Sequence, residues 1–473
     1  MINLLLIYPI LACLILFIFK KKFLNNFFII SYAVLHFIIS ILASLNFDFL
    51  PLLQNKFFSI NTNKIFLIVL SIVYLAVSIY NAGYMKDDNS TERRIRHYSY
   101  MLLIFIFSMT GAILSTNLGL NWVFIEATTL ASAYLIYFHK TKNSIEAAWK
   151  YVFICSIGIA LAFVGIILLT VSTGNLNSLF YDELYANAQV FNQFWLKLAF
   201  VFIMFGIGTK MGLAPVHFWL PDAHAESPSP ISALLSAALL NSAFLMILKV
   251  FYITSLAGCD SYAKMMLLLM GFISIFVAAV FVYHINNYKR MLAYSSIENM
   301  GILAIGAALG NIGILASIIH LIGHSLVKAA FFMTSGNILK LYDSKKIKSV
   351  SGLIQTDKKT GWLWILSFVG IAAFPPSVLF MSEFLIIRTM IYEQKYILTA
   401  LFLILLTIII YGIGKAIISM SFGKANDIQI KKQFSWTMYL PQIILLVTAF
   451  IIGIYMPQDI INLISESFIE IGG

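Results

Sequence analysis

Long apolar runs, separated by short polar stretches, repeat along almost the whole chain. A membrane-spanning helix needs about 20 consecutive, mostly apolar residues, and about fourteen such windows can be marked in this sequence. The windows cover residues 2–19, 27–45, 65–84, 99–116, 118–137, 151–172, 195–214, 231–254, 265–284, 291–309, 312–339, 362–387, 397–420 and 436–456. The pattern predicts an all-α polytopic membrane protein with about 14 transmembrane helices.

Two of these windows are interrupted by proline. The seventh breaks at Pro215, shortly after Lys210, and the twelfth breaks at Pro375 and Pro376, shortly before Glu383. Irregular backbone is tolerated within a membrane only where it faces protein or a water-filled cavity. Each break therefore marks an interior site, and each lies close to an ionisable side chain.

The two interrupted windows occupy corresponding positions in two blocks of five. Each is the fourth helix of its block, in spans four to eight and nine to thirteen, and a block with an odd number of crossings leaves the next one inverted. Paired, proline-interrupted segments of this kind point to an inverted-repeat transport site. We therefore expect an N-terminal unit at 1–98, inverted repeats at 99–254 and 265–420, and a C-terminal helix with its tail at 436–473.

Composition agrees with this pattern and excludes several classes of function. Of the 473 residues, 61% are hydrophobic and 11% are charged, whereas soluble domains carry roughly 25% charged residues. Cys13, Cys155 and Cys259 are far apart and form no CxxC motif, which gives no sign of a metal site or disulfide. The chain contains no GxGxxG, Walker or HExxH motif, so we expect no metal and no bound cofactor.

The charge of the chain indicates its topology. The formal net charge is +11, and most lysine and arginine residues fall in loops that follow odd-numbered spans, such as Lys20–Lys22 and Lys345. Loops rich in basic residues remain in the cytoplasm. We therefore expect a multi-pass protein of the inner (plasma) membrane with both termini outside, and we attribute the basic excess to topology and to contact with the lipid bilayer rather than to nucleic acid.

Glu126 and Lys210 are ionisable side chains within predicted spans. A charged group at the bilayer centre costs about 2.5–3.5 kcal/mol on insertion scales, so such residues are usually paired, hydrated or functional. A buried carboxylate can also hold helices together, and a lysine near a helix end can extend its ammonium group to the membrane surface. If the two side chains face one another, they form a coupled pair in which moving a charge changes whether the lysine holds a proton.

A second set of ionisable residues lies in HLIGHSLVKAAFF (320–332). His320, His324 and Lys328 are spaced four residues apart and share one stripe of a helix. Two histidines at this spacing can bind zinc, but no HExxH glutamate accompanies them. The stripe favours a proton relay, and Glu298, in the preceding span, is a candidate to extend it.

Other charged residues leave more than one interpretation open. Lys249 lies near a helix end, where extension to the surface is as reasonable as function, and Lys415 lies within a span with no acidic residue near it in sequence. The remaining charged or titratable residues occupy the polar corner after Pro215, where we expect solvent. Of these, Asp222, His224 and Glu226 form either a cytoplasmic mouth for protons or only a capped turn.

Three motifs carry a resemblance to a known superfamily. TKMGLAPVHFWLPDAHAESPSPISALLSA (209–237), HLIGHSLVKAAFF (320–332) and YKRMLAYSSIENMG (288–301) resemble the antiporter-like membrane subunits of respiratory complex I. The same superfamily includes the Mrp-type cation/proton antiporters and the membrane arms of group 4 [NiFe] hydrogenases, such as formate hydrogenlyase. The resemblance covers spans four to thirteen.

The resemblance implies a proton-translocating subunit that has no redox centre of its own. It implies partners: other membrane subunits and a peripheral redox arm of hydrogenase or NADH dehydrogenase type, with protons or Na⁺ as the transported ions. By this resemblance Glu126 pairs with Lys210, the stripe at 320–328 is the central relay, and Glu383 is the ionisable residue after the second break. The chain departs from the family at Asn241, where a lysine or histidine is usual, since an asparagine can hold a water but cannot carry the proton.

The branch of the superfamily is a separate question. The glutamate in SSIENMG, Glu298, resembles hydrogenase-type members, whereas complex I members usually have a small residue there. We therefore favour a subunit of a redox-driven, group 4 hydrogenase-like complex over a subunit of NADH:quinone oxidoreductase. Two alternatives stay open, namely a subunit of an Mrp-type Na⁺/H⁺ antiporter and a membrane scaffold of a hydrogenase that does not pump.

Overall fold

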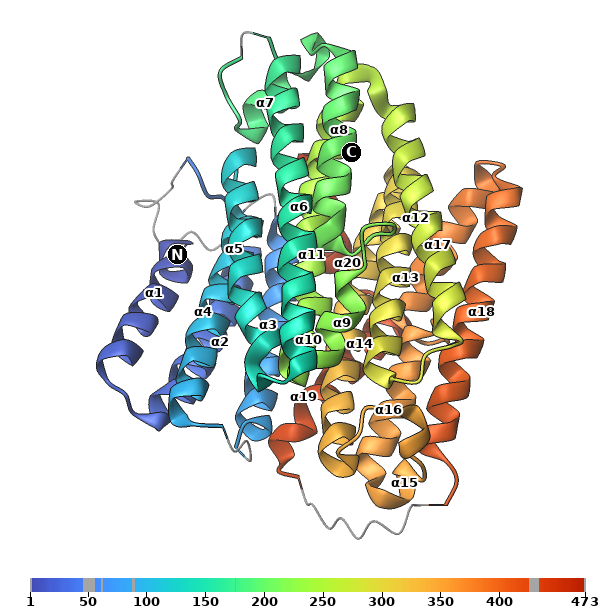
Figure 1. Cartoon of the computed structure of the whole chain (residues 1–473). Coiled ribbons are helices and arrows are strands. Elements are labelled where there is room, and N and C mark those ends of the chain that lie inside the picture. The colour runs from blue at the N-terminus through green and yellow to red at the C-terminus, as the bar shows by residue number, and fades with distance from the viewer. Residues whose placement is uncertain are drawn as a thin grey trace.

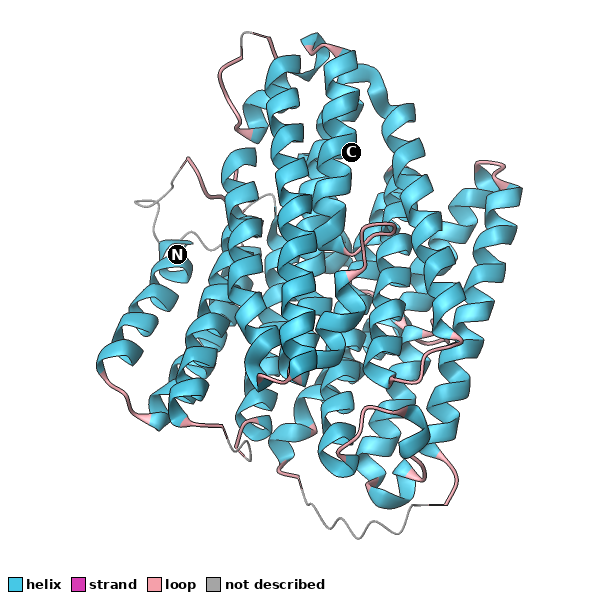
Figure 2. Cartoon of the chain, in the orientation of Figure 1, coloured by secondary structure: helices cyan, strands magenta, loops and turns pink. Residues whose placement is uncertain are grey.

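The described part of the chain is built almost entirely from helices. The computed structural model describes residues 2–45, 56–60, 63–86, 90–174, 176–424 and 434–471. Within these ranges β-type pairing is limited to three isolated bridges, between Phe58 and Ser115, Asn117 and Phe180, and Asn287 and Lys346. Figure 2 shows the same predominance of helix. The predicted all-α architecture is confirmed for these residues.

The first helices lie on one side of the molecule and α17 and α18 on the other, and α19 and α20 return to its central region (Figure 1). The first part of the chain forms α1 Ile2–Ile18, α2 Lys22–Ser44, α3 Lys64–Tyr84, α4 Glu92–Leu114, α5 Leu118–Ile136, η3 Tyr137–His139, α6 Lys142–Ser172, α7 Tyr181–Asn187, η4 Ala188–Val190, α8 Gln193–Met211, α9 Trp219–Glu226, α10 Ser229–Leu234, η5 Leu235–Leu239 and α11 Leu240–Thr254. The second part forms η6 Ser255–Cys259, α12 Asp260–Val282, α13 Tyr288–Ala308, α14 Asn311–Tyr342, η7 Ile347–Ser349, α15 Leu353–Thr356, α16 Lys358–Ile371, α17 Val378–Tyr392, α18 Tyr396–Ser421, η8 Trp436–Met438, α19 Leu440–Ile454 and α20 Gln458–Ile471.

Many of these helices suit a membrane. Among the described residues, nine helical stretches are long and apolar enough to cross one. The stretch from Ser229 to Val282 contains Gly258 at φ +76°, a non-helical residue that separates α11 from α12. A helix lies in each predicted apolar window, and the two interrupted windows contain helices that end near the prolines. The chain is therefore a multi-pass membrane protein.

Several helices begin earlier than the apolar pattern predicts. Thr91 caps α4 by accepting a hydrogen bond from the Arg94 amide, and Thr141 caps α6 through the Ser144 amide at 3.1 Å. A side-chain oxygen at this position satisfies one of the free amides of the first turn. The helix then continues through a polar first turn, which a hydropathy pattern assigns to the loop.

Small residues let two pairs of helices pack closely. A Cβ atom on Gly206 of α8 would lie 2.5 Å from the carbonyl oxygen of Gly158 on α6, and one on Gly271 of α12 would lie 2.8 Å from that of Gly301 on α13. Membrane helices lack a hydrophobic driving force between them, so close backbone approach at small residues is a main source of association. The two crossings lie in the two predicted repeats, one in each.

The 32-residue helix α14 lies in the middle of the molecule (Figure 1) and is buried along nearly all its length. It packs against α10, α13, α16, α17 and α19, so it contacts helices from both predicted repeats. Its side chains at 320, 324 and 328 are consequently fully buried.

The N-terminal helices are joined by a buried histidine. His36 of α2 forms hydrogen bonds through Nδ1 to Ser71 Oγ of α3 at 2.6 Å and through Nε2 to Thr110 Oγ1 of α4 at 2.9 Å. A buried polar group needs such partners, because leaving it unsatisfied costs free energy. His36 therefore links two helices of the N-terminal unit to α4, the first helix of the first predicted repeat.

Candidate functional site

The first break is a left-handed turn followed by a short buried helix. α8 ends at Met211, and Gly212 adopts φ +80°. Side chains satisfy the polar backbone that the break exposes: the Ala214 amide donates to Ser274 Oγ at 2.9 Å, and the Trp219 indole donates to the Thr209 carbonyl at 2.7 Å. The irregular backbone is therefore covered by protein, as expected for a break within a membrane.

Lys210 lies in the last turn of α8 and is completely buried. Its ammonium group donates to the Tyr151 hydroxyl at 2.8 Å and to Thr128 Oγ1 at 3.5 Å, and lies 4.9 Å from the centre of the Tyr151 ring. The Tyr151 hydroxyl in turn forms a 2.6 Å hydrogen bond with Ser132. A cation in the last turn also interacts favourably with the partial negative charge at the helix C-terminus.

Glu126 does not form a direct ion pair with Lys210. Its carboxylate accepts a hydrogen bond from Thr129 Oγ1 at 3.1 Å, and the side chain is only half-buried on α5. Glu126 nevertheless lies close enough to interact electrostatically with Lys210 and Tyr151. In this structure the hydroxyl groups of Thr128 and Tyr151 occupy the positions next to the ammonium group, and the interaction of Lys210 with Glu126 acts at longer range.

The second break is arranged like the first, but its unwound segment is shorter. α16 ends at Ile371, Ala373 adopts φ +51°, and α17 begins at Val378. Ser377 bridges the gap, because its hydroxyl donates to the Gly370 carbonyl at 2.8 Å and accepts from the Leu379 amide at 3.2 Å. Sequence and structure agree that each interrupted window contains an unwound segment beside its ionisable residue.

His320 connects the second break to α13. Its Nδ1 lies 3.0 Å from Ser382 Oγ on α17, and its Nε2 lies 3.0 Å from Asn299 Oδ1 on α13. Ser382 precedes Glu383 and Asn299 follows Glu298 in sequence. Both glutamates are buried and interact electrostatically with one another. The histidine therefore lies between two hydrogen-bonding partners that each neighbour a buried carboxyl group.

Lys328 and His324 continue the stripe along α14. The ammonium group of Lys328 donates to the Leu292 carbonyl at 2.8 Å and interacts electrostatically with Glu298. His324 is fully buried, and both of its ring nitrogens lack a hydrogen-bond partner. A buried imidazole without partners is unusual, and it marks a place that an ordered water can occupy.

His224 is buried rather than solvated. The sequence led us to expect a solvent-filled corner after Pro215, but residues 219–226 form the helix α9, which packs against α6 and α13. The His224 ring stacks on Phe332 at 4.6 Å, and both of its nitrogens lack partners. His217 is buried as well. This part of the prediction is wrong, because α9 turns His224 toward the protein interior and the segment before α9 also buries His217.

Asp222 and Glu226, in contrast, are half-buried residues on the side of α9 that faces the basic loops. Asp222 pairs with Lys150 at 3.1 Å and with Arg290, and Glu226 pairs with Lys345 at 2.9 Å. Both carboxylates line a cavity of about 150 Å³. The structure thus brings these two predicted residues together and separates them from His224.

Asn241 forms a hydrogen bond between the two predicted repeats, from α11 in the first to α14 in the second. Its side-chain amide donates to Ser325 Oγ of α14 at 2.7 Å and to the Ala237 carbonyl at 2.8 Å, whereas its Oδ1 has no partner. Ser236 and Ser296 form a second polar link between the halves, at 2.8 Å. Asn241 therefore lies next to the α14 stripe, where an acceptor oxygen is free to bind water.

Lys249 and Lys415 have opposite environments. Lys249 is 3% exposed, and its ammonium group donates to the Ser115 carbonyl at the end of α4, at 3.1 Å, and lies over the Tyr181 ring. Lys415 is exposed on α18, and its ammonium group lies 5.1 Å from the centre of the Tyr283 ring. The structure therefore leaves Lys415 outside the interior cluster, because it lies on the outward face of its helix.

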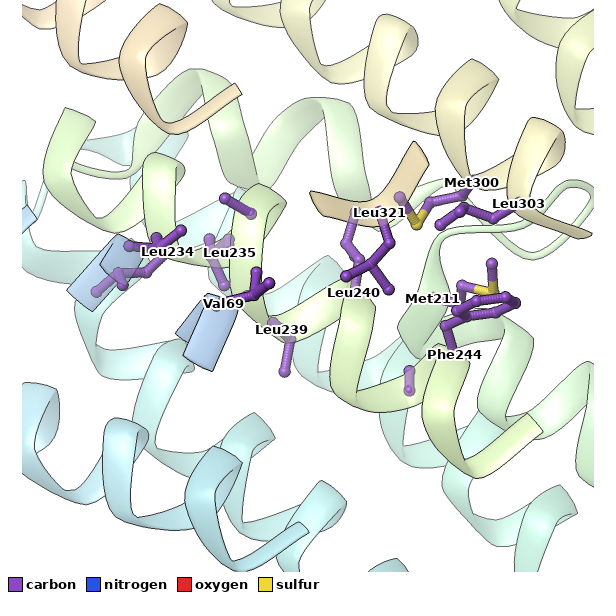
Figure 3. Close-up of a cluster of buried hydrophobic side chains, with 14 of the residues drawn as sticks. Val69, Met211, Leu234, Leu235, Leu239, Leu240, Phe244, Met300, Leu303 and Leu321 are labelled. Carbon is purple, nitrogen blue, oxygen red and sulfur yellow. The ribbon is translucent and has the colours of Figure 1, made fainter. Parts of the chain in front are cut away.

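Apolar side chains fill the space between the polar groups. Figure 3 shows Leu240 next to Leu321, with Met211 and Phe244 on one side and Leu239 on the other. Leu240 precedes Asn241, Met211 follows Lys210, and Leu321 follows His320 in sequence. Asn241, Lys210 and His320 are thus each adjacent in sequence to a buried apolar residue of this cluster.

Sequence reasoning missed several polar partners. Tyr151, Thr128, Ser382 and Asn299 carry no charge, so nothing in a hydropathy pattern distinguishes them from ordinary residues of a span. Lys289 lies between the windows predicted at 265–284 and 291–309, yet it is fully buried and donates to the Ser227 carbonyl at 2.7 Å. The polar sequence SSIEN, later in the same helix, was the available sign that this helix extends back to include Lys289.

Comparison with known proteins gives consistent results. A family model described as NADH:quinone oxidoreductase/Mrp antiporter, TM matches residues 115–410. A protein named hydrogenase-4 component F homolog, from Methylacidiphilum infernorum (isolate V4), is 33% identical over 413 residues, which is 85% of each chain.

Two solved structures share the fold. A chain of the membrane-bound sulfane sulfur reductase, an archaeal respiratory membrane complex, superposes with a TM-score of 0.87 at 22% identity, over 98% of this chain and 96% of that one. A chain of the Mrp complex from Dietzia sp. DQ12-45-1b gives 0.86 at 15% identity, with the same coverage.

Proposed function

The chain belongs to the NADH:quinone oxidoreductase/Mrp antiporter transmembrane family as an antiporter-like membrane subunit, and we propose that it moves protons through the interior cluster around its two broken helices. The observation that carries the proposal is the number of ionisable side chains that are buried in the interior of the protein. Lys210, His224, Glu298, His320, His324, Lys328 and Glu383 are all buried. Such groups are costly within a membrane, and where they occur they usually mark routes for ions or protons.

The proposed route has two parts that meet at α14. In the first, Glu126 acts on Lys210 across the hydroxyl groups of Thr128 and Tyr151, and the carboxylates of Asp222 and Glu226 form the cytoplasmic mouth. In the second, His320 exchanges protons with Glu383 across the Ser382 hydroxyl, whereas Asn299 accepts a hydrogen bond from the imidazole and orients it toward Glu298 without carrying the proton.

The connection between the two parts passes Asn241. Its free Oδ1 and the unpartnered nitrogens of His324 are suited to hold water between them. We propose that His324 and Lys328 carry the proton that Asn241 cannot. The apolar residues of Figure 3 exclude water from this connection until they move apart, because dewetting closes a narrow apolar passage.

We propose that the energy comes from a redox partner in a larger complex. Moving one proton against 100 mV costs about 2.3 kcal/mol, and the chain carries no motif for a redox centre. The relative named hydrogenase-4 component F homolog favours a group 4 hydrogenase-like complex over NADH:quinone oxidoreductase. A mild-detergent pull-down with mass spectrometry decides between them: hydrogenase subunits support this assignment, and subunits that react with NADH or quinone contradict it.

The membrane topology is inferred from the distribution of basic residues and from the two breaks. We infer fourteen crossings of the plasma membrane with both termini outside, an N-terminal unit at 1–98, inverted repeats at 99–254 and 265–420, and a C-terminal helix with its tail at 436–473. The repeats are supported by the corresponding breaks and by the matched close crossings at Gly206 and Gly271. Cysteine accessibility at Lys20 and Lys348 from the cytoplasmic side tests the orientation, and labelling of either position from outside contradicts it.

The direct test compares two lysines within membrane helices. We expect Lys210→Met to reduce proton uptake by inverted vesicles at least about tenfold, since it removes a positioned proton carrier, and to leave the complex assembled. Lys415→Met removes a lysine from the exposed face of α18 and should leave uptake unchanged. Normal uptake in the Lys210 variant contradicts proton transport through this site and favours a scaffold that does not pump.

An Mrp-type Na⁺/H⁺ antiporter is the second candidate, favoured by the shared fold with a chain of the Dietzia Mrp complex. Sodium-dependent proton exchange by vesicles, abolished in Lys210→Met, supports this function. Proton uptake that is the same with and without sodium rejects it.

A further inference from the structure

A basic cavity lies at the end of the bundle where α12 turns into α13. Its volume is about 590 Å³, within the range of small-molecule sites, and its lining includes His284, Arg290, Lys346 and Lys348. Glu226 is the carboxylate in the lining, and its charge is balanced by Lys345 at 2.9 Å. The cavity therefore presents an excess of positive charge.

Two of the cations remain available for a ligand. Arg290 already pairs with Asp222, whereas Lys346 and Lys348 are exposed and form no ion pair with any residue in the described ranges. The cavity also lies at the beginning of α13, a helix of 21 residues whose N-terminal end carries a partial positive charge. An anion that enters the cavity meets both contributions.

The loops that hold these lysines are fixed by backbone hydrogen bonds. The Tyr288 amide donates to the Lys345 carbonyl at 3.1 Å, and the Ile347 amide donates to the Asn286 carbonyl at 2.8 Å. The Tyr288 hydroxyl also donates to the Ser344 carbonyl at 3.0 Å. Lys346 and Lys348 are therefore held beside Asn286 and Asn287, so a ligand does not have to order these loops when it binds.

Exposed aromatic residues near the cavity indicate its level relative to the membrane. Tyr283, which precedes His284, is 52% exposed, and Tyr411, 60% exposed, stacks on it at 6.3 Å. The ammonium group of Lys415 lies over the Tyr283 ring. Exposed tyrosines and lysines of membrane helices lie at the level of the lipid head groups, so the cavity opens beside that layer.

We propose that this cavity binds a phosphate group, of the kind carried by an anionic lipid head group. Charge, preformed loops and depth all favour such a ligand, and basic cavities between membrane helices are suited to phosphorylated head groups. The proposal does not depend on proton transport, because Lys346 and Lys348 lie outside the interior cluster.

Native mass spectrometry of the full chain in mild detergent tests the proposal. We expect phosphatidylglycerol to be retained more strongly than phosphatidylcholine of the same chain length. We expect the Lys346→Gln/Lys348→Gln variant to weaken phosphatidylglycerol binding by roughly tenfold or more, since each basic side chain at an anionic surface contributes to attraction. Lys20→Gln/Lys21→Gln removes the same charge at exposed positions far from the cavity and should bind as the unaltered protein does.

Inorganic phosphate identifies the source of the ligand. Millimolar phosphate is added to the unaltered protein and to the Lys346→Gln/Lys348→Gln variant. If it displaces phosphatidylglycerol from the unaltered protein but does not displace the lipid that the variant still binds, the cavity also binds phosphate from solution. If phosphate has no effect and the variant still loses the lipid, the site is specific for lipid. Equal binding of the two lipids, or equal loss in both lysine variants, overturns the proposal.

Discussion

Both broken helices place an ionisable side chain beside an unwound segment, but the two side chains have opposite charge and lie on opposite sides of their breaks. At the first break the ionisable residue, Lys210, precedes the gap, and at the second, Glu383 follows it. The first gap begins with Gly212 in a left-handed conformation, whereas the second contains Ala373 in that conformation. Each gap is closed by a side-chain hydrogen bond to a carbonyl of the preceding helix, from the Trp219 indole in one case and the Ser377 hydroxyl in the other.

The position of the charge relative to the break decides how firmly it is held. Lys210 lies in the last turn of α8, where the partial negative charge of the helix end stabilises it, and two hydroxyl groups contact its ammonium. Glu383 lies beyond the first turn of α17 and forms no hydrogen bond or ion pair within the described parts of the chain. The lysine site is therefore preorganised, whereas the glutamate depends on groups that must come to it.

The largest expected effect tests that difference at Glu383. Glu383→Gln removes the charge but keeps the shape, so we expect proton uptake to fall about tenfold or more with little change in stability. Glu383→Lys should restore part of the uptake, because a lysine also supplies a titratable group at this position. Uptake in inverted vesicles and the thermal midpoint measure both effects, and unaltered uptake in Glu383→Gln means that the second break takes no part in transport.

Gly212→Ala should destabilise the first break by about 1–3 kcal/mol. Alanine in the left-handed region costs roughly 1–2 kcal/mol, and the added Cβ would lie 2.5 Å from Leu220 Cδ1. A denaturant midpoint measured in detergent gives the change. A neutral result means that the turn relaxes, and it removes the argument that glycine is required there.

Ser377→Ala should cost about 1 kcal/mol at the second break. The change removes the N-terminal cap of α17, typically worth 0.5–2 kcal/mol, and the hydrogen bond to Gly370. Ser419→Ala is a suitable control, because Ser419 forms only a local hydrogen bond to Ala416 on exposed α18. Equal midpoints for the two variants show that the bridge across the gap adds no stability.

Ala373→Gly should have the smallest effect. Glycine adopts the left-handed conformation readily, so relief at φ +51° offsets the entropy that glycine adds to the unfolded chain. We expect a change within about 0.5 kcal/mol in either direction. A loss as large as that of Gly212→Ala indicates that the two breaks do not differ in the way described.

Much of this architecture could be predicted because it is local. A run of apolar residues must form a helix when water is absent, since each backbone amide and carbonyl needs a partner within its own segment. The prolines near 215 and 375 interrupt that pattern wherever the helices lie. The buried stripe at 320, 324 and 328 likewise follows from helical periodicity.

The tertiary structure decided which of these side chains meet. The hydroxyl groups beside Lys210, the buried stacking of His224 on Phe332, and the outward position of Lys415 depend on the rotation and depth of each helix. Hydropathy specifies that a segment crosses the membrane but hardly constrains its rotation, because lipid and protein interior are almost equally apolar. Close packing between helices supplies the missing constraint, and it therefore determines the site.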